Sequence, residues 1–286
     1  MLEPHYNTVI IGAGPAGLIA GVEAFNPNHS VVILEKMHKT GLKLRISGKG
    51  RCNITNEESM QSFLNRFGKK GRFLKYAFSQ FFNHDLLKYI NDMGVPTKLE
   101  RGGRYFCESD RATDIVVAFE KKLSALNIPI AMKSHVTGIK RNDDGQYVLK
   151  VKQGEHLTQV LADQLCVCSG GLGYPATGST GEGYAMAKTF GHTIIDTAPS
   201  LVPVLTAGDT AKRVMGLSLR NISLSIWDEG KKVTEMFGEM MFTRKGVTGP
   251  IILTLSETLV TMLNSRKEVQ IKIDLKPALD HKKLDQ

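Results

Sequence analysis

A glycine-rich hexapeptide near the start of the chain restricts the available folds more than any other feature of the sequence. It reads Gly12-Ala13-Gly14-Pro15-Ala16-Gly17. The apolar run at 8–11 before it predicts a buried strand, and residues 15–25 predict a helix. A second apolar run at 31–34 completes a strand–helix–strand unit of about 30 residues. This order favours an α/β fold with a parallel sheet.

Each glycine of the hexapeptide has its own purpose in such a unit. Gly12 allows a tight turn, Gly14 lets the backbone approach a pyrophosphate, and Gly17 lets the helix pack closely on the strand. The phosphates would face the unpaired N–H groups and the positive end of the helix. Glu35 ends the second strand, where a carboxylate can accept hydrogen bonds from both hydroxyls of an adenosine ribose. The sequence therefore predicts a dinucleotide site.

The segment after Glu35 favours FAD over NAD as the dinucleotide. We interpret residues 41–56 as a long functional loop, whereas an NAD domain would continue into its next helix and strand. Four cations among small residues suit close approach to an extended, flat, anionic cofactor. These residues are Lys43-Leu44-Arg45-Ile46-Ser47-Gly48-Lys49-Gly50-Arg51-Cys52-Asn53. In flavoproteins with two dinucleotide folds, a later strand such as 136–140 passes the adenine, and a turn such as 169–171 passes the flavin.

The pattern K-L-x-I-S-G-x-G-R-C-N-x-T-N over residues 43–56 is long enough to be specific. It resembles the signature of a bacterial family of FAD-dependent oxidoreductases known as BaiN-like, YhiN-like or aminoacetone-oxidase-family enzymes. Four later stretches, 103–110, 169–184, 199–203 and 238–250, are similar to the same family. The chain departs from the family pattern at Cys107, where proline is usual, and at Arg244, where histidine is usual.

The resemblance implies a two-dinucleotide-fold, glutathione-reductase-like FAD domain with a β-rich domain inserted in it. We assign residues 1–199 to the FAD domain and residues 200–286 to the start of the inserted, substrate-side domain. The implied chemistry is hydride transfer between flavin and a small organic substrate, with NAD(P)H as a transient reductant. Members of the family continue beyond the position of Gln286, so the resemblance also implies a C-terminally incomplete chain that holds FAD weakly.

The candidate cofactor-binding residues fall into four groups: the glycine motif, the end of the second strand, the basic loop and two later segments. They are Gly12, Ala13, Gly14, Pro15, Ala16, Gly17, Glu35, Lys36, Lys43, Ser47, Gly48, Gly50, Arg51, Cys52, Asn53, Val136, Ser169, Gly170 and Gly171. Lys43, Arg51 and Asn53 are the predicted flavin-proximal groups, because a cation near the flavin N1/C2 region stabilises the anionic reduced ring. The sequence does not identify a general acid or base.

The composition is that of a globular protein, with 42% hydrophobic residues and a net charge of +9. The four cysteines are too few and too scattered for a disulfide framework, which favours a reduced, cytoplasmic protein. The eight histidines show no metal-ligand spacing, so we predict no metal site. No apolar run reaches the roughly 18 residues of a membrane span, so we predict no membrane partner.

Two functions remain as alternatives to an oxidoreductase that acts on a small organic substrate. One is a catalytically inactive, truncated FAD-binding module. The other is a flavin-dependent tRNA-modifying enzyme, because the basic cluster at 36–51 attracts anions. That cluster lacks interleaved aromatic residues and coincides with the predicted cofactor loop, so nucleic acid is not favoured as a partner. Ala207-Gly208-Asp209 resembles the Gly-Asp that ends related flavoprotein folds, but its context predicts a surface turn.

Overall fold

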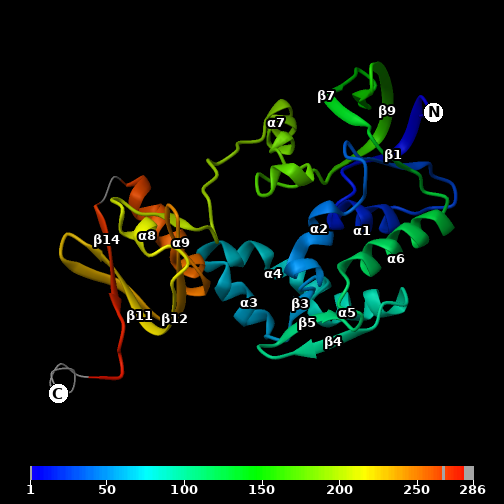
Figure 1. Ribbon diagram of the computed structural model, residues 1–286. Helices are drawn as coiled ribbons and strands as arrows, with labels where there is room; N and C mark the ends of the chain where they lie inside the picture. The colour runs from blue at the N-terminus through cyan, green and yellow to red at the C-terminus, as the bar shows by residue number, and fades with distance from the viewer. Residues whose placement is uncertain (1, 266–267, 280–286) are drawn as a thin grey trace. The chain divides into compact units, whose positions relative to one another are not determined.

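The computed structural model describes residues 2–265 and 268–279, apart from the side chain at position 69 (Figure 1). Backbone contacts divide the chain into two compact units, Met1–Ile194 and Ile195–Gln286. The division therefore falls near residue 195, compared with residue 199 from the sequence. The assignment of the units as cofactor domain and insert stays a prediction.

The first unit is built on a six-stranded sheet in the order β6-β2-β1-β9-β8-β7. β1, β2, β6 and the second half of β9 run parallel, whereas β7, β8 and the first half of β9 form an antiparallel meander. The strands are β1 (His5–Ile11), β2 (Val31–Leu34), β6 (Ile130–Ala131), β7 (His135–Arg141), β8 (Tyr147–Gln153) and β9 (His156–Val167).

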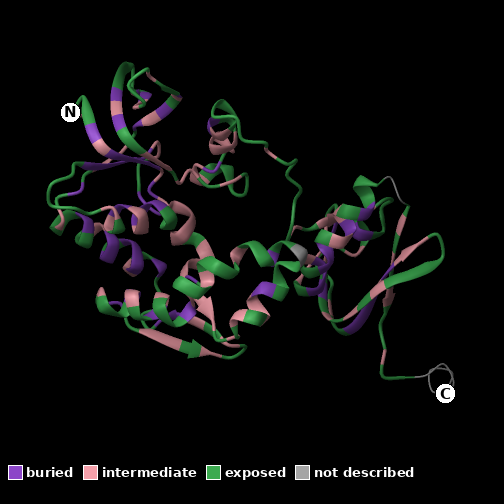
Figure 2. Ribbon diagram, turned by 180° about the vertical axis from the view of Figure 1, so that it is seen from behind, coloured by how far each residue is buried: buried purple, intermediate pink, exposed green. Residues whose placement is uncertain are grey.

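Both faces of the central strands are buried, as a parallel sheet with two covered faces requires. Ile10 and Ile33 point to one side, where helices α1 (Pro15–Glu23) and α6 (Ala112–Ala125) pack on them. Val9 and Val32 point to the other side, into a core that includes α7 (Glu182–Thr189). Figure 2 shows the resulting concentration of buried residues along the sheet and its adjoining helices. Successive residues of a strand point to opposite faces, and both faces are buried here. The strands are therefore continuous apolar runs in the sequence, at 8–11 and 31–34.

Residues 42–107 form a mainly helical segment with a small antiparallel sheet in the order β3-β5-β4. Its elements are α2 (Leu42–Ile46), η1 (Ser47–Gly50), β3 (Thr55–Asn56), α3 (Met60–Arg66), η2 (Gly68–Lys70), α4 (Gly71–Gln80), α5 (Asn83–Asp92), β4 (Thr97–Glu100) and β5 (Arg104–Cys107). The prediction of one long loop at 41–56 was wrong in part. Leu44 packs on the core beneath α6, and Arg45 donates hydrogen bonds to the Thr40 carbonyl and to Glu120, which stabilises a helical turn there.

Two further predictions need correction. The pattern of residues 110–126 predicts a helix with Asp110 as its N-cap. Asp110 instead has a left-handed backbone with φ of 55°, its carboxylate accepts from Arg51 and Lys98, and the helix begins after Arg111. The sequence predicts a strand at 157–161 and a separate buried run at 165–168, but the structure has one continuous strand there, β9. Asp163 interrupts the apolar pattern but accepts hydrogen bonds from Asn7 and Gln146, so the polar interruption does not end the strand.

The second unit is a five-stranded sheet in the order β10-β13-β12-β11-β14, with helix α9 packed on one face. Apolar residues of the helix such as Ile252 and Leu259 are buried among strand residues such as Leu224 and Ile226. Ala207-Gly208-Asp209 lies in an exposed turn, as predicted. The elements are β10 (Val204–Leu205), α8 (Thr210–Arg213), β11 (Ser218–Asp228), β12 (Lys231–Thr243), β13 (Gly246–Thr248), α9 (Pro250–Asn264) and β14 (Val269–Asp274).

Candidate functional site

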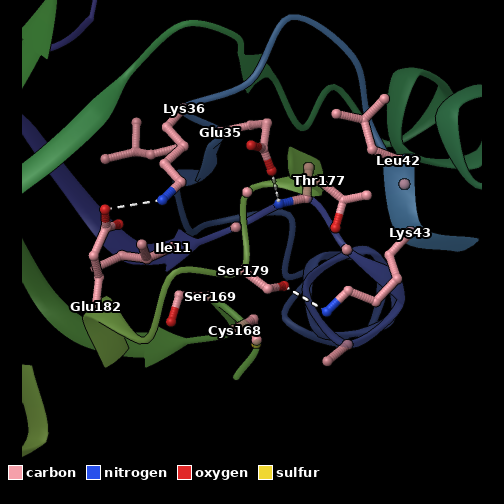
Figure 3. A pocket seen from close by; sticks show the side chains of 18 of the residues that line it. Ile11, Glu35, Lys36, Leu42, Lys43, Cys168, Ser169, Thr177, Ser179 and Glu182 are labelled. Atoms are coloured by element: carbon pink, nitrogen blue, oxygen red, sulfur yellow. Dashed lines mark hydrogen bonds and ion pairs between the residues drawn. The ribbon is translucent and has the colours of Figure 1, made fainter. Parts of the chain in front are cut away.

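A cavity of ≈ 450 Å³ lies at the carboxyl ends of β1, β2 and β9 in the first unit (Figure 3). This edge of a parallel sheet is where ligands of such folds bind. Most of the predicted cofactor residues line it. They are Gly12, Ala13, Gly14, Pro15, Ala16, Glu35, Lys36, Lys43, Val136, Ser169 and Gly170. The cavity therefore brings together residues of the glycine motif, the end of β2, the basic loop and both later segments.

The three glycines of the motif differ in what surrounds them. A Cβ on Gly12, whose φ is +101°, would lie 2.6 Å from the carbonyl oxygen of Cys168. A Cβ on Gly17 would lie 1.8 Å from the carbonyl oxygen of Gly12. A Cβ on Gly14 would meet no atom within 4 Å. Two of the glycines are therefore required by the fold itself, whereas Gly14 borders open space that a ligand can occupy.

The N-terminus of α1 opens toward this space. Gly14 precedes the helix and Pro15 begins it, and no side chain caps it. The first N–H groups of a helix have no intrahelical partner, so they are free to donate to an anion. A pyrophosphate fits this place by charge and by the room left at Gly14.

Glu35 is fixed at the end of β2 by two backbone hydrogen bonds. Its Oε2 accepts from the N–H of Ala13 at 2.7 Å, and its Oε1 accepts from the N–H of Met37 at 2.7 Å. The side chain is buried but lines the cavity. Each carboxylate oxygen keeps further acceptor capacity, which suits a pair of ribose hydroxyls. The residues present therefore fit the adenosine and pyrophosphate half of FAD.

A polar cluster forms one wall of the cavity. The Lys36 ammonium donates to Thr180 at 2.7 Å and pairs with Glu182 at 2.9 Å, and His135 lies 3.2 Å from the same carboxylate. Burial works to raise the pKa of Glu182, but the hydrogen bond from Lys36 and the nearby charges outweigh it and lower the pKa. Glu182 therefore remains ionised and fixes the Lys36 side chain.

Lys43 crosses the cavity to residues that the sequence did not single out. Its Nζ lies 2.6 Å from the hydroxyl of the buried Ser179, and Gly170 leaves the room for that hydroxyl. Thr177, Gly178, Ser179 and Glu182 all belong to the 169–184 stretch that resembles the family, yet only its first residues were predicted as site residues. The resemblance was the signal that could have identified them.

Eight predicted site residues do not line this cavity: Gly17, Ser47, Gly48, Gly50, Arg51, Cys52, Asn53 and Gly171. Arg51 instead pairs with Asp110 at 2.6 Å and with Glu100, and its guanidinium lies 4.3 Å above the ring of Phe106. These hydrogen bonds raise the pKa of Arg51. The structure thus places Arg51 in an ion-pair network, and its role beside the flavin stays a prediction.

Cys52 and Cys107 are buried, whereas Cys166 and Cys168 are half-buried. Burial raises the pKa of Cys52, and burial and neighbouring groups raise the pKa of Cys107 to about 11. Cys166 and Cys168 have their sulfurs 3.5 Å apart, and burial with this contact raises the pKa of Cys168 to about 12. Within residues 2–265 and 268–279, no set of three or more His, Cys, Asp or Glu converges as metal ligands. In the same ranges, no helix is long and apolar enough to cross a bilayer.

A family model described as "HI0933-like protein Rossmann domain" matches residues 6–262. The chain belongs to this HI0933-like family. It is 30% identical over 258 residues to the ribosomal RNA dihydrouridine synthase of Haemophilus influenzae, covering 89% of this chain and 62% of that protein. It is 28% identical over 274 residues to the 3-dehydro-bile acid delta(4,6)-reductase of Clostridium scindens, covering 95% of this chain and 64% of that protein. The HI0933-like chain therefore spans less than two thirds of the length of these relatives.

Solved structures share the fold at low identity. A flavocytochrome c3 fumarate reductase in its open conformation has a TM-score of 0.53 at 18% identity, covering 77% of this chain and 47% of that chain. The quinol fumarate reductase of Escherichia coli has a TM-score of 0.51 at 16% identity, covering 77% of this chain and 44% of that chain. The family resemblance, the α/β fold with a Rossmann-type FAD domain and a β-rich second unit, and FAD as the cofactor are thereby confirmed.

Proposed function

We propose that the chain is the FAD-binding part of a reductase that adds hydrogen across a carbon–carbon double bond conjugated with a carbonyl. The names of both relatives denote this chemistry: a dihydrouridine synthase saturates the uracil ring, and a delta(4,6)-reductase saturates ring double bonds of a 3-oxo compound. In such a reaction the carbon β to the carbonyl gains a hydride and the α carbon gains a proton. FAD, when bound and reduced, supplies the hydride.

The observation that carries the proposal is the open space at Gly14 between the uncapped α1 and the fixed Glu35 carboxylate. The chain's own residues then have three tasks. The α1 N-terminus binds the pyrophosphate, Glu35 orients the adenosine ribose, and Lys43 holds a positive charge at the wall shared with Ser179. The one G-x-G-x-x-G motif of the sequence, at 12–17, is assigned to FAD, and NAD(P)H is the proposed transient reductant.

Anaerobic reoxidation of the reduced protein tests this proposal. The heat-released cofactor should co-migrate with FAD, and the protein-bound flavin band near about 450 nm should bleach on reduction. Adding a uridine-containing RNA or a 3-oxo-Δ4 steroid should restore the band, and mass spectrometry should find a product heavier by two hydrogens. A Gly14→Val variant, which fills the space meant for the pyrophosphate, is the matched control without cofactor.

The rival is a module that binds FAD but catalyses no turnover. It predicts a yellow protein whose reduced flavin is reoxidised only by oxygen, with neither substrate converted. A colourless protein that takes up no FAD would contradict both the proposal and the rival.

A further inference from the structure

The exposed side of helix α4 combines cations and aromatic rings without any acidic residue. Between residues 59 and 84 the sequence has five lysines and arginines and no aspartate or glutamate. Phe73 and Tyr76 are large aromatic residues, yet 88% and 76% of their surfaces are exposed. Exposed aromatic rings of this size require an explanation, because burying each one would stabilise a fold.

One side of α4 attaches the helix to the protein. Phe78 packs against Phe63 and Phe82 with ring centroids 6.1 and 5.3 Å away, and Leu74 is half-buried on the same side. Helical spacing places Arg72, Phe73, Lys75 and Tyr76 on the opposite side, since residues three and four apart are neighbours. We call Arg72, Phe73, Lys75 and Tyr76 the α4 face.

The cations of the α4 face have no ion-pair partner among residues 2–265 and 268–279. The nearby Arg66, in contrast, pairs with Glu58 at 2.9 Å. A protein partner that covered the two rings with apolar surface would leave the charges of Arg72 and Lys75 to be desolvated or neutralised. A polyanion with flat, exposed bases satisfies both requirements, because phosphates pair with the cations and bases stack on the rings.

We propose that the α4 face binds single-stranded RNA. This inference rests on the proposed function and narrows its substrate to a uracil base within RNA, in line with the relative that acts on ribosomal RNA. The basic cluster at 36–51 lacks aromatic residues, which disfavours nucleic acid at that place. The segment 66–76, in contrast, interleaves aromatic residues with cations. A duplex would not need the rings, because its bases are already stacked.

Fluorescence anisotropy with a labelled, single-stranded oligouridylate tests the inference on the full chain. Phe73→Leu with Tyr76→Leu keeps apolar helix-forming residues but removes the stacking, and should weaken binding by about tenfold or more. Arg72→Gln with Lys75→Gln should weaken binding and lower the slope of log K against log salt by about 1.4, the value for two phosphate contacts on a single strand. Lys121→Gln with Lys122→Gln, exposed cations on helix α6, is the matched control and should change neither.

Each variant should keep the circular dichroism spectrum and FAD uptake of the parent chain, so that lost RNA binding is not lost folding. Equal RNA affinity in the parent and both α4 double variants would overturn the inference. The inference would also be overturned if Phe73→Leu with Tyr76→Leu changed only self-association, measured by sedimentation. That result would identify the α4 face as a contact between copies of the chain. Failure of the proposed function is distinguishable, because RNA would then bind through α4 without reoxidising the reduced flavin.

Discussion

At the scale of single residues, Glu35 is the side chain on which the proposed adenosine half of the site depends. Its two carboxylate oxygens accept from the backbone N–H groups of Ala13 and Met37, so it links the glycine turn to the end of β2. The carboxylate is therefore in place before any ribose arrives. A preformed acceptor of this kind saves the ordering entropy that a mobile side chain would lose on binding.

We predict that Glu35→Gln weakens FAD binding by about 1.5–3 kcal/mol, the range for hydrogen bonds to a charged group. The amide –NH2 would also face one of the two backbone N–H groups, so the free energy of unfolding should fall by about 1–3 kcal/mol. Titration of the apoprotein with FAD and urea unfolding measure the two effects. FMN lacks the adenosine ribose, so its binding is the control; an equal loss of FMN affinity would show that Glu35 acts through the fold alone.

The ion pairs around Arg51 predict a pH-dependent stability. Hydrogen bonds from Lys98 and Arg51 lower the pKa of Asp110, and the hydrogen bond from Arg51 lowers the pKa of Glu100. Their folded pKa values lie below the unfolded values near about 4. The stabilisation is thus complete at neutral pH and declines as the pH falls through the lowered folded values.

The variant Asp110→Asn measures this contribution, because asparagine tolerates the left-handed backbone at this position. We expect the variant to be less stable than the parent chain in urea at pH 7, with the difference shrinking toward zero at strongly acidic pH. A difference that is unchanged by acid would mean that the loss comes from the turn geometry and not from the charge.

At the scale of elements, the turn between β1 and α1 provides a matched pair of substitutions. Gly17→Ala places a methyl group against the Gly12 carbonyl, so it should destabilise the fold by about 1–3 kcal/mol or more. Gly14→Ala meets open space and its φ of −77° suits alanine, so stability should be retained while FAD affinity falls. Thermal unfolding and FAD titration of both variants would separate the packing role of Gly17 from the ligand-binding role of Gly14. An unchanged FAD affinity in Gly14→Ala would show that the pyrophosphate does not bind at this position.

The sequence was most informative where structure is local. The unit at 8–34 could be predicted because its turn, helix and strands are specified by adjacent residues. The turn at α2 was missed because its stability comes from Glu120 and the α6 core, far along the chain. The wall formed by Ser179 and Glu182 was missed for the same reason: both residues meet Lys36 and Lys43 only after folding.

At the scale of the whole molecule, the division near residue 195 predicts a protease-sensitive connection. Residues 192–203 have no helix or strand, and Ile195 and Leu201 are 74% and 69% exposed. Thermolysin cleaves before such residues, so brief digestion of the native chain should yield two resistant fragments. We expect the N-terminal fragment to retain FAD binding. First cleavage inside the β-sheets instead would contradict the two-unit description.

The position of β1 has a consequence for the motions of the protein. It lies between β2 and β9 with both of its faces covered, and Val9 and Ile10 have no exposed surface. Its amide hydrogens should be among the last to exchange with deuterated water, doing so only when the whole unit unfolds, whereas the edge strand β7 exchanges through local opening. The glycine turn follows directly on the last residue of β1, so the proposed phosphate site is attached to the slowest-exchanging strand of the unit.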